Sequence, residues 1–405
     1  MLSRYLSIIL IILGSCKVAP VDSVNQEIRQ LTTIEKNLIQ SNYIFGLELF
    51  KRINERDKDK NIFISPLSVS FAIGMVLNGA GSQTYDSIKK TLFVTDLSQT
   101  EINQSYKSLT DLLLGVDPKV KFKIANAIFY RNNITIKNNF FDENKKYFNA
   151  LIEGLDFATP ASVNKINKWA NENTEGKIPI IVERISENEI MFLLNAVYFK
   201  ADWKLPFDKS MTRDDWFKKS IKDSVACKMM TQEINAGYFE NDNFQVIELP
   251  YSNGAYSMGI ILPKIGQNID QIIKNLSEES LKQCFDQMEA REVKLFLPKF
   301  QIKYKIDLSP VLKSLGMSIA FDPENADFTK IYEGPERAYI TNVAHSTFVE
   351  VNEEGTEAAA VTSITIGITS IRDRIVVRCD RPFLFMIKEK NTNSIVFIGK
   401  LVYPS

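Results

Sequence analysis

The sequence predicts an α+β fold with large mixed or antiparallel β-sheets in a single domain. Strand-like and helix-like segments do not alternate strictly along the chain, which argues against a parallel, doubly wound sheet. Hydrophobic residues make up 45% of the 405 residues and charged residues 24%, so the chain can bury a large core. No internal repeat and no linker rich in Pro or Gly divides the sequence.

The predicted elements follow one another from about residue 37 onward. Helical periodicity begins after a polar spacer, a short strand over 63–65 is closed by Pro66, and a strongly apolar helix is predicted over 67–79. Further helices are predicted over 162–174, 269–275 and 308–315. Strands are predicted over 123–130, 191–199, 245–249, 257–262, 293–297, 345–351, 374–378, 384–388 and 395–402.

The composition excludes several classes of function. Lysine plus arginine and aspartate plus glutamate each number 49, so no basic excess points to nucleic acid. His345 is the single histidine, which rules out a multi-histidine metal site and leaves any hydrolase triad with one candidate base. The cysteines form no CxxC pair, and we expect Cys227, Cys284 and Cys379 to be mostly free and buried. No metal or other cofactor is predicted.

The first 15 residues are typical of an export signal. Arg4 precedes an apolar run over 6–13, which is too short to span a bilayer and fits the core of a signal peptide. The run ends in Leu13-Gly14-Ser15-Cys16, which resembles a bacterial lipobox, and this implies a lipid on Cys16 that anchors the protein to a membrane. An ordinary secretory signal, with Cys16 incidental, is the alternative. We therefore expect a lipoprotein of the bacterial envelope, at the outer membrane or surface, or otherwise a secreted, extracellular protein.

The segment 350–374 is the most informative part of the chain. Glu353-Glu354-Gly355 breaks the preceding strand, and small residues follow until β-branched residues take over at 363. Even positions from 356 to 368 are small and then apolar, whereas odd positions are mostly polar, which is the period-2 pattern of a strand with one buried face. Gly355 and Arg372-Asp373-Arg374 are typical of loop boundaries. The pattern fits a segment that is exposed in one state and a sheet strand in another; a core β-hairpin is the alternative, which periodicity alone favours.

Five blocks in order along the chain carry a resemblance to one protein family. They are 61–68 (NIFISPLS), 194–203 (LNAVYFKADW) with Pro206-Phe207, 297–300 (LPKF), 353–362 (EEGTEAAAVT) and 379–385 (CDRPFLF). Together they resemble the serpins, which are serine protease inhibitors, and 353–362 resembles the reactive-loop hinge of the inhibitory members. The resemblance covers about residues 37–405, which we take as one serpin domain after a signal over 1–15 and a spacer over 16–36. With the lipobox, the chain resembles bacterial lipoprotein serpins.

The resemblance implies a fold and a mechanism. The fold is a large central mixed sheet with smaller sheets, surrounding helices and an exposed reactive-centre loop over about 353–374. The mechanism is suicide inhibition of serine endopeptidases, and of cysteine endopeptidases as a second class. The target protease forms a covalent acyl complex with the loop, and insertion of the cleaved loop into the central sheet traps it. The chain would act as a monomer and not as an enzyme. A non-inhibitory serpin, acting as a binding or structural envelope protein, is the alternative.

The resemblance also assigns residues to roles. The small side chains of the hinge let the strand pass between its neighbours without a clash. The hinge comprises Glu353, Glu354, Gly355, Thr356, Glu357, Ala358, Ala359, Ala360, Val361 and Thr362. A polar network beneath the sheet, called the shutter, corresponds to Ser65, Ser68, Asn195 and His345, so that His345 has a structural role. The breach, where the loop first enters the sheet, corresponds to Trp203 and an ion pair between Lys299 and Glu353.

The scissile bond follows from spacing within the family. It usually lies after the fourteenth residue beyond the hinge glycine, and counting from Gly355 gives the bond between Thr369 and Ser370, which we favour. A small or aliphatic residue there suits elastase-like or subtilisin-like proteases. Counting backward from the conserved C-terminal block gives a loop about two residues longer than a common length and a cut after Ile371. Arg372, which a trypsin-like enzyme would seek, is the third option.

Overall fold

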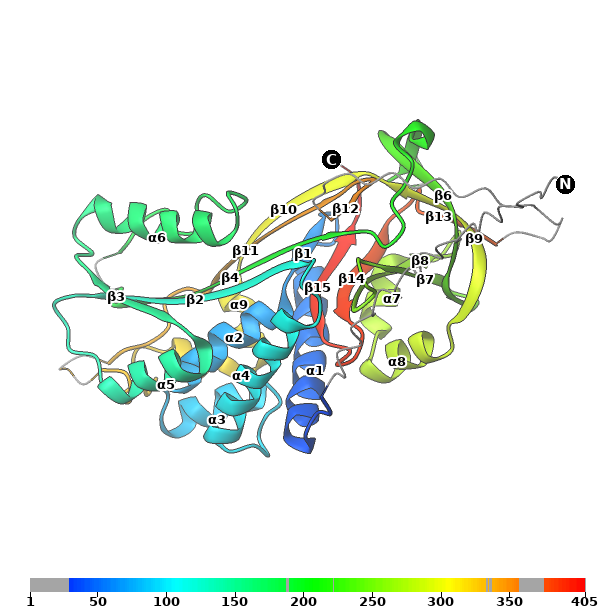
Figure 1. Ribbon diagram of the computed structural model, residues 1–405. Helices are drawn as coiled ribbons and strands as arrows, with labels where there is room; N and C mark the ends of the chain where they lie inside the picture. The colour runs from blue at the N-terminus through cyan, green and yellow to red at the C-terminus, as the bar shows by residue number, and fades with distance from the viewer. Residues whose placement is uncertain are drawn as a thin grey trace, which may run out of the picture. The chain divides into compact units, whose positions relative to one another are not determined.

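The computed structural model of the chain describes residues 29–186, 189–220, 222–332, 334, 337–356 and 375–404. The contacts group Thr32–Ser405 into one compact unit that contains two β-sheets and the helices around them (Figure 1). Its helices are α1 (Thr33–Arg56), α2 (Pro66–Leu77), α3 (Ser82–Thr91), α4 (Gln99–Gly115), α5 (Asn138–Phe148), α6 (Pro160–Asn173), α7 (Ile269–Asn275), α8 (Glu278–Asp286) and α9 (Ser309–Leu312). Short helical turns lie at Lys209–Met211, Lys313–Met317 and Ser318–Phe321.

Side-chain caps define where several helices begin. α1 and α4 each start with a capping box between a Ser or Thr and a Glu three residues later. Ser65 caps α2, because its hydroxyl accepts a hydrogen bond from the Ser68 N–H at 3.2 Å, and Pro66 occupies the first turn. The local sequence therefore places Ser65 at the junction between strand β1 (Ile62–Ile64) and the buried helix α2.

The six-stranded sheet has the strand order β10-β11-β12-β4-β2-β3. Its strands are β10 (Phe300–Asp307), β11 (Ala344–Val351), β12 (Gly355–Thr356), β4 (Met191–Asp202), β2 (Lys121–Arg131) and β3 (Leu151–Leu155). β2 and β3 are parallel, whereas β12 is antiparallel to both of its neighbours. The sheet is therefore mixed, and β11 and β4 have the same direction on either side of β12.

The nine-stranded sheet has the order β1-β15-β14-β8-β7-β6-β9-β13, with β5 paired to β6. Its strands are β1 (Ile62–Ile64), β15 (Ile395–Leu401), β14 (Phe383–Glu389), β8 (Tyr256–Pro263), β7 (Phe244–Pro250), β6 (Ser224–Glu240), β9 (Glu289–Pro298), β13 (Ile375–Arg378) and β5 (Arg213–Lys218). Every residue of β8, β14 and β15 is buried. These strands, which are mostly apolar and fully buried, form the centre of the core.

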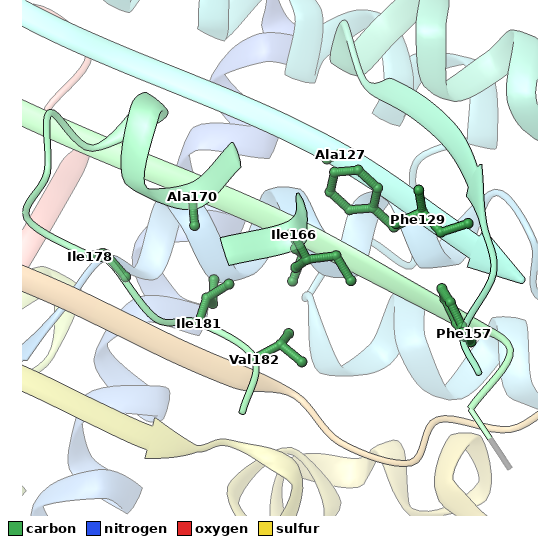
Figure 2. Packing of buried hydrophobic residues seen from close by; sticks show 10 residues of the cluster. Ala127, Phe129, Phe157, Ile166, Ala170, Ile178, Ile181 and Val182 are labelled. Atoms are coloured by element: carbon green, nitrogen blue, oxygen red, sulfur yellow. The ribbon is translucent and has the colours of Figure 1, made fainter. Parts of the chain in front are cut away.

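Helix α6 packs on β2 and β4 of the six-stranded sheet. Ile166 and Ala170 of α6 are fully buried, and they gather with Ile178, Ile181 and Val182 of the segment that follows the helix (Figure 2). Apolar residues of β2, β3 and β4 complete this cluster. The helix and the following segment therefore cover part of the sheet mainly by apolar contact, and Lys165 of α6 also pairs with Glu153 of β3.

The predicted α+β class with large mixed sheets is confirmed. Every predicted strand overlaps a strand of the structure, and the predicted helices, including the one after the polar spacer, correspond to α1, α2, α6, α7 and α9. Cys227, Cys284 and Cys379 are free and buried, as expected. None of the described helices is long and apolar enough to cross a membrane.

Candidate functional site

A tight turn after β11 brings the chain back into the six-stranded sheet. The Asn352 side chain accepts hydrogen bonds from the N–H groups of Glu354 at 3.0 Å and Gly355 at 3.3 Å. The Asn352 N–H in turn donates to the Gly355 carbonyl at 3.0 Å. An asparagine that binds its own backbone two residues on is a typical turn former. The turn at Asn352 therefore reverses the chain direction, and the residues that follow enter the sheet between β11 and β4.

Gly355 and Thr356 form β12 and already lie inside the sheet. Thr356 is opposite Val351 of β11 and Ala201 of β4, and it is only 3% exposed. A Cβ atom at Gly355 would lie 2.2 Å from the Ala201 carbonyl oxygen, so this position excludes every larger residue. The structure differs here from the expectation of a loop exposed from 353 onward, because backbone pairing on both sides buries the first residues.

An aromatic pair lies directly against β12. The rings of Trp203 and Tyr251 stack with centroids 4.5 Å apart and an interplanar angle of 8°. The Trp203 indole N–H donates to the Asn352 carbonyl at 3.0 Å, and the Trp203 backbone N–H donates to the Glu354 carbonyl at 2.8 Å. The Tyr251 hydroxyl lies 2.7 Å from the Thr356 hydroxyl oxygen. Burial raises the pKa of Tyr251, so this hydroxyl keeps its proton.

Two ion pairs hold the carboxylates of the turn. Lys299 Nζ lies 2.8 Å from one carboxylate oxygen of Glu353, and the Thr212 hydroxyl donates to the other at 2.9 Å. Burial raises the pKa of Glu353, but the hydrogen bonds from Lys299 and Thr212 outweigh that effect and hold the pKa below its usual value. Glu354 pairs with Lys209. Lys299 and Glu353 of the predicted breach are therefore in direct contact, and Trp203 bonds to the carbonyls of Asn352 and Glu354 on either side of Glu353.

The four residues of the predicted shutter lie together beneath the sheet. The Ser65 N–H donates to His345 Nε2 at 3.2 Å, and the Ser65 hydroxyl donates to the Val396 carbonyl at 2.8 Å. Ser68 donates to Asn195, whose amide donates to Asn126 at 2.6 Å. The network therefore links α2 and β1 to β4, β11 and β15.

His345 has the surroundings of a structural residue. It is 6% exposed, and burial lowers its pKa to about 4. Among the described residues, the one hydrogen bond to its ring comes from the Ser65 backbone, so no nucleophile is paired with it. The ring is therefore neutral at pH 7 and acts as an acceptor that joins β11 to the start of α2.

A slot continues the path of β12 between β4 and β11. These two strands make no direct ladder with each other in the described chain, and β12 fills only two positions between them. A small hollow directly beyond β12 is lined by residues that include Val197, Phe199, Val349 and Thr356. Farther along, a cavity of about 490 Å³ lies between the ends of β4 and β11, above α2. Its lining includes Ser68, Leu193, Asn195, Val343 and His345.

Several predicted residues lie outside the described residues. They are Cys16, the hinge residues Glu357, Ala358, Ala359, Ala360, Val361 and Thr362, and the candidate cleavage positions Thr369, Ser370, Ile371 and Arg372. Sequence reasoning in turn missed Asn352, Thr212, Lys209 and Tyr251. Only Asn352 carried a local signal, since it precedes a glycine by three residues at the end of a strand. No cluster of metal-ligating side chains occurs in the part of the chain that the structure describes.

Comparisons with known proteins agree with this geometry. The family model described as Serpin (serine protease inhibitor) matches residues 40–404. Serpin B8 of Homo sapiens is 33% identical over 376 residues, covering 91% of this chain and 100% of that protein. Leukocyte elastase inhibitor of Xenopus laevis is 32% identical over 380 residues, covering 91% of this chain and 100% of that protein.

Solved structures show the same likeness. The native state of the thermophilic serpin tengpin superposes with a TM-score of 0.85 at 32% identity, covering 93% of this chain and 95% of that one. The serpin fold expected from the sequence is thereby confirmed. The family description also places the chain among protease inhibitors and not among enzymes. The chain belongs to the serpin family of serine protease inhibitors.

Proposed function

We propose that the chain is an inhibitory serpin that traps serine endopeptidases by inserting the residues after Thr356 between β4 and β11. The observation that carries the proposal is β12 itself, a two-residue strand at the head of a gap that the described residues leave between β4 and β11. A protease that cleaves the segment forms an acyl-enzyme with the new C-terminal end. Continued growth of β12 then draws that end along the sheet.

The register of β12 supports the proposed path. Thr356 is opposite Val351 and Ala201, so an antiparallel strand that continues from it brings Ala358 opposite Val349 and Phe199. Two further steps of two residues bring Thr362 opposite His345 and Asn195. The hydroxyl of Thr362 would thereby meet the polar shutter, and Ile364 would meet the apolar side chains of Leu193 and Val343.

The direction of Thr356 supports the predicted parity of the segment. Its side chain points inward to Tyr251, so all even-numbered residues of a regular strand would point inward as well. Ile364, Ile366 and Ile368 would then each bury apolar surface worth about 1.5–3 kcal/mol. Glu357 would point outward, where a charge is tolerated.

We also propose the specificity, chain organisation and location that follow from the sequence. The scissile bond is Thr369–Ser370, and the target is an elastase-like or subtilisin-like enzyme; the name of the leukocyte elastase inhibitor supports this class. The serpin domain spans 37–405 and acts as a monomer. The chain is exported, and a lipid on Cys16 anchors it to the bacterial envelope.

The test is a direct search for the covalent complex. Residues 17–405 are mixed with an elastase, a subtilisin and trypsin, and the products are separated on denaturing gels. We expect a complex that survives denaturation, together with a released peptide that begins at Ser370, as identified by mass spectrometry. A peptide that begins at Arg372 or Asp373 would move the scissile bond to Ile371 or Arg372. Clean cleavage by all three enzymes without a complex would contradict inhibition of these classes and favour a non-inhibitory binding protein.

A further inference from the structure

We propose that the outer face of the β5–β6 hairpin binds the body of the protease that cleaves the segment 357–374, with Trp216 as the anchor of this contact. The contact lies outside the cleaved segment, and it therefore selects among proteases that accept the same scissile bond. This inference rests on the proposed function, because it concerns the same protease.

The β5–β6 hairpin has one face that is exposed to solvent. Trp216 is directly opposite Ala226, and Asp214 is directly opposite Lys228, with which it forms an ion pair at 2.8 Å. Side chains alternate between the two faces of a strand, so these four residues share one face, and each of them is exposed. Phe217 on the other face is fully buried. We call the four exposed residues the hairpin face.

Trp216 is the most exposed of the three tryptophans of the chain. Trp203 is 3% exposed and Trp169 packs on the apolar cluster of α6, whereas Trp216 is 63% exposed. Burial of such a large ring against a partner removes much apolar surface from water. Tryptophan is also enriched among the residues that dominate binding energy at protein interfaces. Trp216 is therefore the side chain of the hairpin face whose burial would contribute most to binding.

The hairpin contacts the residues that precede the segment. The Lys299 N–H donates to the Lys228 carbonyl at 2.8 Å, and the Lys299 side chain pairs with Glu353. Thr212, which directly precedes β5, donates its hydroxyl to the same carboxylate at 2.9 Å. The chain therefore enters the segment from a turn that is fixed to the hairpin.

The hairpin also contacts the residues that follow the segment. Asp215 of β5 pairs with Arg378 of β13, and the Lys218 N–H donates to the Asp380 carbonyl at 2.7 Å. Both ends of the segment are thus held at the same hairpin. A protease that binds the middle of the segment is tethered over this part of the surface, where a second contact adds to binding without any change at the active site.

A groove of about 470 Å³ lies beside the hairpin face. Three residues of the hairpin face line it, and these are Asp214, Ala226 and Lys228. Phe300, Val351 and Pro404 also line it, and so does Asn352 of the turn before the segment. The groove therefore connects the hairpin face to the start of the segment, and it offers room for a side chain of the docked protease.

Removal of the Trp216 ring should slow association with the protease. The measurement is the second-order rate constant of covalent complex formation with the enzyme, among elastase, subtilisin and trypsin, that the wild type traps fastest. We expect Trp216→Ala to lower this constant about tenfold, and Trp216→Phe, which keeps an aromatic ring, to lower it less. The number of inhibitor molecules consumed per trapped protease should not change, because Trp216 lies outside the insertion path.

The control variant truncates an exposed apolar side chain elsewhere. Leu151 is 45% exposed on β3, which is the edge of the six-stranded sheet opposite β10. Leu151→Ala should leave the rate constant unchanged. A loss equal to that of Trp216→Ala would overturn the inference, because exposed apolar surface in general would then explain the effect.

Fluorine spectroscopy observes the contact itself. Residues 17–405 labelled with 5-fluorotryptophan give one resonance for each of the three tryptophans, and the resonance of Trp216 is identified by its absence from Trp216→Phe. A protease whose catalytic serine is replaced by alanine binds the segment but forms no acyl-enzyme. We expect this inactive enzyme to shift the resonance of Trp216 more than those of Trp203 and Trp169.

The outcomes separate this inference from the proposed function. A Trp216 resonance that does not move when the inactive protease saturates binding, or a rate constant of Trp216→Ala equal to that of the wild type, would overturn the inference. A lower melting temperature together with a changed stoichiometry in Trp216→Ala would also overturn it, because Trp216 would then act on the fold. If the wild type traps none of the three enzymes, the proposed function fails, while the spectrum with inactive elastase still decides whether Trp216 contacts a docked protease.

Discussion

The two sheets of the molecule differ in how completely they are built. β8, β14 and β15 of the nine-stranded sheet are paired on both sides and buried along their whole length. In the six-stranded sheet, β4 and β11 are separated by the two residues of β12 and then by a cavity. One sheet is continuous and buried, whereas in the other the described residues leave a gap between β4 and β11 beyond β12. Under the proposed function, the first sheet supplies stability and the gap in the second receives the cleaved segment.

The largest effect on protease trapping is expected from a charge on the inward face of the segment. Ala358→Arg would bring a guanidinium between Val349 and Phe199, where no acid lies opposite it in the register of β12. We expect this variant to be cleaved and released without a covalent complex, because burial of an unpaired charge stops insertion. Ala359→Arg, on the outward parity, is the matched control and should still trap the protease. Trapping by both variants would exclude insertion along this register.

Matched leucines test the two sheets directly. Leu384 of β14 is fully buried in the nine-stranded sheet, whereas Leu193 of β4 lines the cavity. Leu384→Ala should lower the free energy of unfolding by about 3 kcal/mol or more, and Leu193→Ala by about 1 kcal/mol, as measured by denaturant unfolding. After cleavage, Leu193→Ala should lower the free energy of unfolding by more than in the intact protein, because the inserted segment would pack against Leu193. Equal costs in the intact protein would show that the slot is as tightly packed as the core.

The sequence predicted the fold more fully than the site, for physical reasons that particular residues show. Long, mostly apolar runs, such as α2 and β14, were predicted because local pattern and burial agree. β6 was missed because its seventeen residues alternate irregularly between exposed and buried positions. The inward direction of Thr356 was predicted by the alternation of residue types between even and odd positions of the segment. Tyr251 and Thr212 could not be predicted, because their partners are at least 100 residues away in sequence and no local motif joins them.

The buried histidine of the shutter makes the stability of the protein depend on pH. The pKa of His345 is lowered from 6.5 to about 4 in the folded protein, so the unfolded state binds its proton first as the pH falls. The contribution to stability is therefore fully present above pH 6.5 and is lost as the pH falls toward 4, by about 3 kcal/mol in total. Thermal unfolding between pH 4 and 7 checks this. Glutamine does not titrate, so His345→Gln should make the melting temperature depend less on pH between pH 4 and 7. If the dependence is unchanged, it comes from other groups.

The smallest expected effect concerns the ion pair of the breach. Lys299 is 39% exposed at its side chain, while Glu353 is 6% exposed, so solvent screens the pair in part. Lys299→Gln should lower the free energy of unfolding by about 1 kcal/mol, because the buried carboxylate of Glu353 loses its cationic partner and keeps weaker bonds such as the one from Thr212. Lys228→Gln, which removes an exposed pair with Asp214, is the control and should have no measurable effect. If both variants lose the same free energy of unfolding, burial of Glu353 does not strengthen its ion pair with Lys299.

Under the proposed function, the six-stranded sheet is incomplete until the cleaved segment fills the gap between β4 and β11. The most direct test compares thermal unfolding of the intact protein with that of the protein cleaved within 357–374. Completion of the sheet buries three isoleucines and adds a strand paired on both sides, so the melting temperature should rise by about 10 °C or more. An unchanged or lower melting temperature after cleavage would contradict the account, because the slot would then accept no strand.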